Sequence, residues 1–149
     1  MALRYEYIGK PKDSDEGIEL MQKIAPLLAE QWEARGQPFY GYPFTLNYEA
    51  FIMLWLKNAF VFIVAFEDDV PVGILIGIKF IPMYHQCSIL QIENCYGKRG
   101  EIEIGLYQYL KSLKNVIGYD ELWLATHINN KDLNLGEVIG KSEIIRYKA

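Results

Sequence analysis

The sequence has few cysteines and no long apolar run. Its two cysteines, Cys87 and Cys95, have no second pair beside them, so the spacing indicates neither a disulfide framework nor a zinc site, and no metal site is expected. The β-type run Phe60–Phe66 is far shorter than the ~18 apolar residues of a membrane span. Met1–Lys10 is polar and lacks the apolar core of a signal peptide. These absences indicate a cytoplasmic protein without a membrane span.

Positive charge is also scarce. The 15 Lys and Arg residues are outnumbered by 19 Asp and Glu residues, which gives a formal net charge of −4. No basic stripe is present, so nucleic-acid binding is not expected. Aromatic residues are abundant, with 11 Tyr, 7 Phe and 3 Trp. They indicate a well-filled core or tyrosines at a contact surface. The length of 149 residues predicts a single domain, residues 1–149.

Hydrophobic periodicity predicts an alternation of strands and helices. The predicted strands are Leu3–Ile8, Phe60–Phe66, Val72–Phe80, Ser88–Cys95, Glu121–Thr126 and Glu143–Tyr147, and the predicted helices cover residues 15–35, 48–58, 101–117 and 131–139. This order predicts an antiparallel meander followed by a right-handed strand–helix–strand crossover with parallel strands. We therefore expect an α/β (α+β) fold, in which a mixed, mostly antiparallel central sheet has helices on both faces.

Several local signals refine these elements. Residues 13–15 and Asn47 are of the types that cap helix N-termini. Pro26 lies inside the first predicted helix and is expected to kink it or split it in two. Gly73 and Gly77 lie inside a predicted strand, which indicates a bulge or a close approach of another chain segment.

Residues 88–110 form the stretch around which the rest of the chain is arranged. They read as a short apolar strand, a glycine-flanked basic loop with the sequence Gly97-Lys98-Arg99-Gly100, and a helix. A strand that ends in such a loop and opens a helix directs backbone N–H groups and the positive end of the helix at one point. This arrangement is typical of an anion site, most often for phosphate.

The element order and several local patterns resemble the GNAT family of acetyl-CoA-dependent N-acyltransferases. The resemblance covers roughly residues 18–147. It rests on the strand, acidic turn and return strand of Val64–Gly73, on the strand, loop and helix of Leu90–Leu110, on the helix end and strand of Lys114–Leu124, and on Asn130, Leu133 and Gly140. The chain also resembles the short GNAT-like proteins of tailed phages, some of which are internal virion proteins.

The resemblance implies transfer of an acetyl group from acetyl-CoA to an amine on a small molecule or a protein. It implies that the end of the fourth strand, the loop and one distant asparagine hold the cofactor; these residues are Asn94, Cys95, Gly97, Lys98, Arg99, Gly100 and Asn130. A base must take the proton of the amine. Glu93, on the central strand, and His85, in the turn before it, are the candidates.

The loop departs from the family's pattern. Gly97 stands where the family has Gln or Arg, and Ile102 stands where it has Gly or Ala, so we expect its side chain to crowd a pyrophosphate. Glu101 would repel the diphosphate, and together with Glu103 it indicates a helix that provides its own anions. The tyrosine that frequently serves as the family's acid is missing near Gly136. The alternative hypothesis is a catalytically inactive protein of the same fold, with a structural or interaction role, for example in a virion or as a homo-oligomer.

Each candidate residue also has a simpler interpretation. Glu93 could be an ordinary solvent-facing strand residue, and His85 an exposed turn residue. Cys95 is more typical of a small buried filler than of a nucleophile, because no Cys-His-Asp order supports it. The aromatic residues of Phe39–Phe44 either line a substrate groove or pack across two helices. The sequence leaves these alternatives open.

Overall fold

The computed structural model describes residues 2–36, 41–84 and 86–124. Its elements, in chain order, are β1 (Leu3–Ile8), α1 (Ser14–Gln31), the π-helix η1 (Trp32–Gly36), α3 (Tyr48–Leu56), β2 (Phe60–Glu67), β3 (Val70–Phe80), β4 (Ile89–Gly97), α4 (Gly100–Ser112), α5 (Lys114–Ile117) and β5 (Glu121–Leu124). This order confirms the predicted one as far as β5. The predicted helix Lys131–Ile139 and strand Glu143–Tyr147 lie outside the described residues. No helix within the described ranges is long and apolar enough to cross a membrane.

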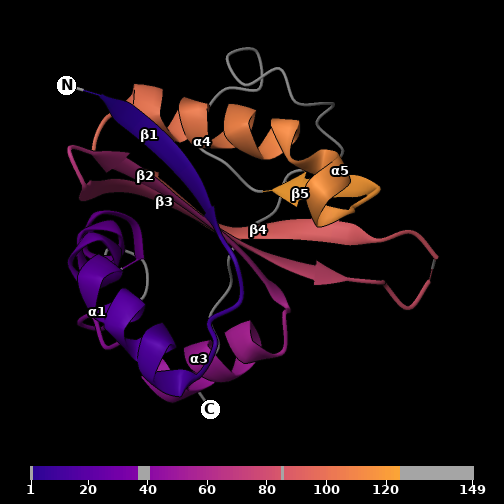
Figure 1. The fold of residues 1–149 in the computed structure, drawn as a ribbon, viewed down its shortest axis with the longest axis horizontal. Coiled ribbons are helices and arrows are strands. Elements are labelled where there is room, and N and C mark those ends of the chain that lie inside the picture. The colour runs from indigo at the N-terminus through magenta and orange to yellow at the C-terminus, as the bar shows by residue number, and fades with distance from the viewer. Residues whose placement is uncertain (1, 37–40, 85, 125–149) are drawn as a thin grey trace.

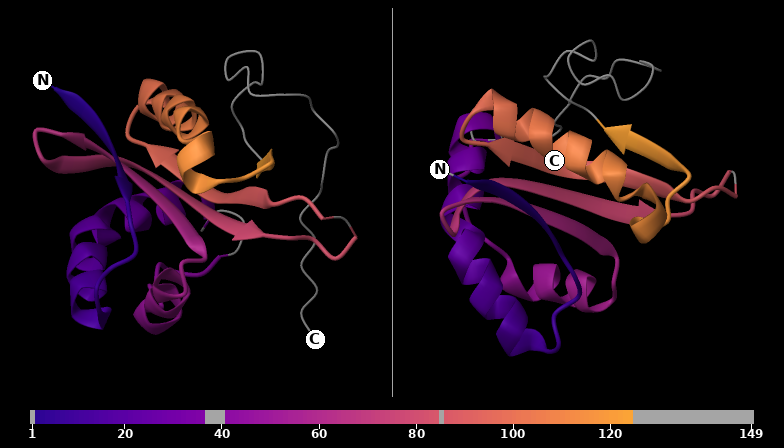
Figure 2. Two further views of the ribbon diagram at one scale, coloured as in Figure 1. Left: turned by 45° about the vertical axis from the view of Figure 1, so that its right-hand side comes forward. Right: turned by 45° about the horizontal axis from the view of Figure 1, so that its top comes forward.

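The strands form one sheet in the order β1-β2-β3-β4-β5. Neighbours from β1 to β4 pair antiparallel, whereas β4 and β5 pair parallel. Helix α4 covers one face of the sheet, and α1 and α3 cover the other, as Figures 1 and 2 show. The fold is therefore the expected mixed, mostly antiparallel sheet with helices on both faces.

Each face of the sheet has its own apolar core. Between the sheet and α4 the largest fully buried side chains are those of Ile63, Leu75, Leu90, Ile102, Leu106 and Leu110. Between the sheet and the helices α1 and α3 they are those of Met21, Ile24, Trp55, Phe62 and Ile74. The near-continuous apolar run of β2 is explained by this arrangement, because its alternate residues face the two different cores.

Helix α1 begins where the sequence predicts it. The Asp13 carboxylate accepts a hydrogen bond from the N–H of Glu16 at 2.9 Å, which satisfies one N–H group of the first turn. The expected split at Pro26 is wrong, because α1 continues through that residue to Gln31. The single helix predicted over residues 101–117 is instead divided at Leu113 into α4 and α5.

The pairing of β3 with β4 contains one irregularity, and it lies at Glu93. Ile76 pairs with Asn94, and Gly77 pairs with Ile92, so Glu93 is an extra residue without a partner on β3. Such a bulge shifts the alternation of side chains by one. Ile92 packs toward α4 before the bulge, and Cys95 packs toward it after the bulge. The bulge expected from Gly77 is present, and the extra residue is on the neighbouring strand.

Candidate functional site

The end of β4, the loop after it and the start of α4 pack closely on the sheet. A β-carbon built on Gly73 would lie 2.5 Å from Cγ2 of Ile102, and one built on Gly97 would lie 2.8 Å from its Cβ. The Ile102 side chain is completely buried between α4 and the sheet. It therefore points into the core and not into the space in front of the loop, contrary to the crowding expected from the sequence.

The start of α4 is open. Arg99 is the N-cap residue and makes no side-chain cap hydrogen bond. The first N–H groups of any α-helix have no acceptor inside the helix, and here they belong to residues such as Gly100 and Glu101. A β-carbon on Gly100 would meet no atom within 4 Å. An anion can therefore approach these N–H groups and the positive end of the helix.

Both cations of the loop are paired with the protein's own carboxylates. Nζ of Lys98 lies 3.4 Å from Oε1 of Glu30, at the end of α1. Nη2 of Arg99 lies 2.7 Å from Oε2 of Glu67, and its Nε lies 2.7 Å from Oε1 of Glu101. Hydrogen bonds to Glu67 and then Glu101 raise the pKa of Arg99 further above its usual value. A bound diphosphate would have to compete with these carboxylates.

One buried carboxylate of α4 contacts the loop from behind. Glu103 is only 2% exposed, and it is the one buried charged or polar residue among those the structure describes. Its Oε1 accepts a hydrogen bond from the N–H of Gly97 at 3.2 Å. The sequence-based expectation of a helix that provides its own anions therefore holds for Glu103.

The other side of β4 faces the end of α1 through polar side chains. Nδ2 of Asn94 donates a hydrogen bond to Oε1 of Gln31 at 3.2 Å, and the Tyr96 hydroxyl donates one to Oε2 of Glu30 at 3.1 Å. Oδ1 of Asn94 is buried and has no hydrogen-bond partner among the described residues. A buried carbonyl oxygen of this kind is costly to leave without a donor.

Pairing with β5 leaves the second half of β4 uncovered within the described residues. Glu121–Leu124 pairs with Ile89–Ile92, and the described part of β5 ends there. The bulge at Glu93 follows directly. We call the backbone edge of residues 94–97, with the loop and the start of α4 after it, the wall of the site; the side chain of Asn94 faces α1 and that of Cys95 faces α4.

Six of the residues expected at the site are neighbours in the chain on β4 and the loop, and their side chains do not all share one face of the sheet. They are Asn94, Cys95, Gly97, Lys98, Arg99 and Gly100. Cys95 is half-buried and packs against the α4 core, as a filler does. Glu93 is exposed on the bulge rather than buried. His85 and Asn130 lie outside the described residues.

Sequence reasoning missed the contributions of α1 and the burial of Glu103. Glu30 and Gln31 contact the site from more than 60 positions away in the chain, and no local pattern marks them. Glu103 had a usable signal, because it lies three and four residues before the buried Leu106 and Tyr107 and so on the same face of α4.

Part of the loop with the aromatic residues of Phe39–Phe44 packs against the core. Phe44 packs against the core of α1 and α3, whereas Tyr42 is 56% exposed. The carbonyl oxygen of Tyr42 accepts a hydrogen bond from Nε1 of Trp32 at 2.6 Å, which ties the loop to the end of α1. Phe39 and Tyr40 lie outside the described residues.

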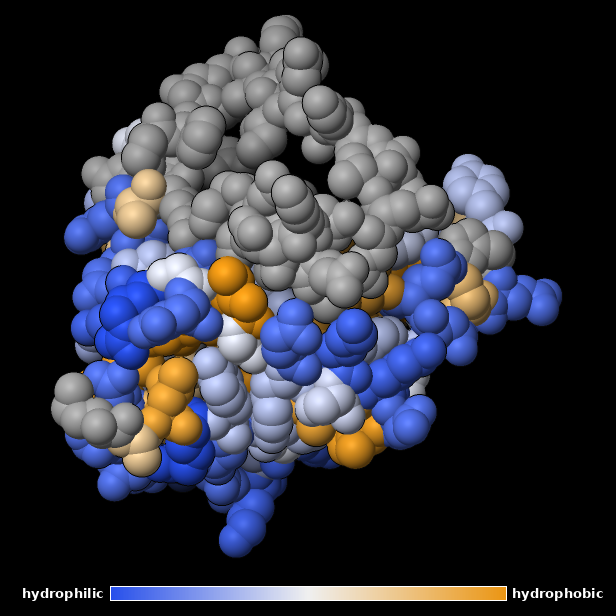
Figure 3. Space-filling model, turned by 90° about the horizontal axis from the view of Figure 1, so that it is seen from above, coloured by the Kyte–Doolittle hydropathy of each residue, from blue (hydrophilic) through white to orange (hydrophobic). Residues whose placement is uncertain are grey.

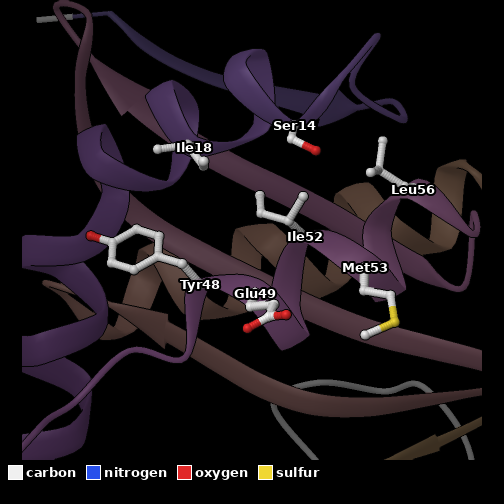
Figure 4. Close-up of a pocket in the computed structure, with 7 residues that line it drawn as sticks. All are labelled: Ser14, Ile18, Tyr48, Glu49, Ile52, Met53 and Leu56. Atoms are coloured by element: carbon white, nitrogen blue, oxygen red, sulfur yellow. The ribbon is translucent and has the colours of Figure 1, made fainter.

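A separate apolar pocket of about 470 Å³ lies between α1 and α3 (Figure 4). It is lined by Ser14, Ile18, Tyr48, Glu49, Ile52, Met53 and Leu56. Ser14 and Glu30 are at opposite ends of α1, about 24 Å apart along a helix. The pocket is therefore not part of the site at β4. No group of side chains that could hold a metal ion is found among the described residues.

Figure 3 looks onto the molecule from above, and the described residues seen there are mostly hydrophilic with scattered apolar ones. This face carries no broad apolar patch among the residues that are coloured. The exposed apolar residues Ile81, Met83 and Tyr84 lie instead at the end of the β3–β4 hairpin, which projects beyond the helices in Figure 1.

Several solved structures of acetyltransferases are similar to this structure in fold. A ribosomal-protein-alanine N-acetyltransferase from Brucella melitensis biovar Abortus 2308 is similar with a TM-score of 0.68 and 19% identity over 100% of both chains. An aminoglycoside acetyltransferase from an uncultured soil metagenomic sample has a TM-score of 0.65 at 16% identity, covering 100% of this chain and 98% of that chain. A GNAT family acetyltransferase from Staphylococcus aureus has a TM-score of 0.61 at 12% identity, with 99% of each chain covered.

Comparison of the sequence with protein-family models gives no match, and neither does comparison with curated proteins. At these identities the structural similarity establishes the fold. The chain has the fold of the GNAT acetyltransferases.

Proposed function

We propose that the protein is an acyl-CoA-dependent N-acyltransferase, which transfers an acetyl group to an amine on a small molecule or a protein. The observation that carries the proposal is the bulge at Glu93, placed directly before the loop and the open start of α4. The exposed Glu93, the β4 edge after it and the N-terminus of α4 follow one another along the chain, which supports the proposal.

Two features of this wall fit acetyl-CoA. The open backbone around Gly100 leaves room for a diphosphate at the helix start. The edge of β4 beyond Ile92 has no β5 partner within the described residues, so its backbone groups can bind the amides of the pantetheine arm. The pairing of Lys98 and Arg99 with carboxylates opposes the fit and predicts weak binding. When bound, the cofactor supplies an acetyl thioester, whose acetyl group passes to the amine nitrogen as the thiol is released.

Glu93 is the base in this proposal. An amine is protonated at neutral pH and must lose a proton before its nitrogen can form the amide bond. The carboxylate of Glu93, exposed on the bulge, can attract the ammonium group and accept that proton directly or through water. Gln31 keeps the Asn94 side chain in place through its 3.2 Å hydrogen bond, and so helps to define the wall beside Glu93.

Calorimetric titration of the protein with acetyl-CoA tests the proposal, followed by mass spectrometry of a panel of amines for acetylation. We expect saturable binding and a mass increase on at least one amine, reduced on Glu93→Gln. No heat of binding at millimolar acetyl-CoA would contradict the proposed activity.

A second candidate function is supported by other features. Both loop cations are ion-paired within the protein, and the β3–β4 hairpin presents apolar side chains, with Met83 90% and Tyr84 92% exposed. These features favour an inactive protein of this fold that binds a protein partner or itself, such as a virion component. Analytical ultracentrifugation without cofactor distinguishes it. A stable oligomer that Met83→Ser and Tyr84→Ser dissolve would favour this candidate, and a monomer would count against self-association.

A further inference from the structure

The carboxylate of Glu103 is buried, so other interactions must replace its lost hydration. A carboxylate removed from water loses much hydration free energy unless hydrogen bonds or opposite charges replace the water. Glu103 lies in the first turns of α4, where the positive end of the helix favours an anion. The N–H of Gly97 donates to its Oε1 at 3.2 Å. The protein thus places an anion of its own behind the loop.

Several backbone N–H groups in and beside the loop already donate hydrogen bonds within the protein. The N–H of Lys98 donates to the carbonyl oxygen of Val72 at 2.9 Å, next to the Gly97 N–H held by Glu103. The N–H of Ile102 donates back to the carbonyl oxygen of Arg99 at 3.0 Å. A ligand phosphate is therefore left with the N–H groups at the start of the helix, around Gly100.

The positive charges of the loop are also paired with carboxylates of the same protein. Lys98 and Arg99 contribute two positive charges, and Glu30, Glu67 and Glu101 are paired with them. The Glu67 side chain is 16% exposed, whereas those of Glu30 and Glu101 are 46% and 70% exposed and can turn away when a ligand arrives. Glu103 cannot, because it is enclosed between the helix and the sheet. Its charge stays next to whatever binds in front of the loop.

We propose that Glu103 is a built-in anion that limits the affinity of this loop for diphosphate ligands. This inference rests on the proposed function, since it concerns acetyl-CoA at the same loop. Glu103 acts through the backbone of Gly97 and through its charge, so it is a positioning and affinity-determining residue rather than a catalytic one.

The test is calorimetry of acetyl-CoA with Glu103→Gln, which keeps the shape and the acceptor oxygen but removes the charge. We expect binding about tenfold tighter than that of the unaltered protein, because a buried charge acts through a weakly screening medium. Glu19→Gln is the matched control, because it removes the same charge from an exposed residue of α1 outside the loop. Its effect should be about threefold or less. Thermal melting verifies that both variants are folded.

The outcomes separate the two proposals. Tighter binding by Glu103→Gln together with no binding by the unaltered protein supports the role of Glu103 and contradicts the proposed activity. Equal or weaker binding by folded Glu103→Gln, or no binding by either protein, overturns the role of Glu103. If Glu103→Gln does not fold, pyrophosphate is titrated into the unaltered ¹⁵N-labelled protein. The amide resonances of Gly100 and Glu101 should then shift while that of Gly97 stays; the largest shift at Gly97 overturns the proposal.

Discussion

The side chain of Ile102 occupies the space into which a β-carbon on Gly73 would project, with only 2.5 Å between Cγ2 and that position. Gly97, on the neighbouring strand, leaves room for the same side chain. Helix α4 therefore lies close to β3 and β4 because two glycines accommodate one branched residue. The loop that begins at Gly97 is held at the sheet by this packing.

The first prediction concerns this contact. Ile102→Ala should lower the free energy of unfolding by about 2–5 kcal/mol, because it leaves a cavity beside two glycines that cannot fill it. Urea denaturation measures the change. Val116→Ala, at a 69% exposed β-branched residue of α5, is the control and should change stability by about 0.5 kcal/mol or less. A similar small change at Ile102 would mean that α4 does not pack as described.

A second prediction separates binding from folding at Gly100. No atom lies within 4 Å of a β-carbon at this position, so Gly100→Ala should leave stability unchanged or raise it by up to about 1 kcal/mol. The added methyl group lies at the helix start, and we expect it to weaken acetyl-CoA binding several-fold in calorimetry.

The matched control for Gly100→Ala is Gly118→Ala. Gly118 has a φ of 76° and ends α5 in the left-handed conformation, which costs an L-residue about 1 kcal/mol or more. This variant should melt at a lower temperature and bind acetyl-CoA as the unaltered protein does. If the two glycine variants showed the reverse pattern, the helix start would not be the ligand site.

The third prediction concerns Tyr5 and Gly105. A β-carbon on Gly105 would overlap the hydroxyl group of Tyr5, whose ring also stacks on Tyr109 with centroids 5.7 Å apart. Gly105→Ala should therefore destabilise the protein by about 1–3 kcal/mol, although alanine is the better helix former. Adding Tyr5→Phe removes the overlapping oxygen and should recover part of the loss. A fully additive double variant would show that the two residues do not touch.

The fourth prediction is a pH dependence at Glu67. The hydrogen bond from Arg99 lowers the pKa of this carboxyl group below its usual value. A group with a lowered pKa in the folded state stabilises the protein above its unfolded pKa, near 4, and this contribution is lost as pH falls through the folded value. Glu67→Gln should therefore be less stable than the unaltered protein at neutral pH, and the difference should shrink as the pH is lowered below the unfolded pKa, near 4. Urea denaturation at neutral and at acidic pH measures it, and a difference that grew on acidification would contradict the pairing.

Local signals in the sequence were sufficient for the order of the elements and for the position of the loop. Asp13 and Asn47 cap their helices as predicted, because N-capping depends on residues within one turn. Gly73 marks a close approach and Gly77 lies at the bulge, as their place inside a strand indicated. The loop could be located because glycine, basic residues and the start of helical periodicity coincide there.

The features that determine the chemistry of the site were not accessible in the same way. The bulge at Glu93 depends on the pairing of β3 with β4. The sequence of β4 alone does not distinguish it from a regular strand. The ion pairs of Lys98 with Glu30 and of Arg99 with Glu67 join segments far apart in the chain, so no local pattern indicates them. The burial of Ile102 does not follow from its position in the loop pattern, because the direction of its side chain depends on how α4 lies on the sheet.

The most direct test of the central claim is a titration of the ¹⁵N-labelled protein with acetyl-CoA, followed by the backbone amide resonances. We predict saturable shifts at Gly100 and Glu101 and along the end of β4 at Asn94, with little change at Gly118. No shifts at millimolar acetyl-CoA, or shifts confined to the α1–α3 pocket around Ile52, would contradict the assignment of this wall as the acyl-CoA site.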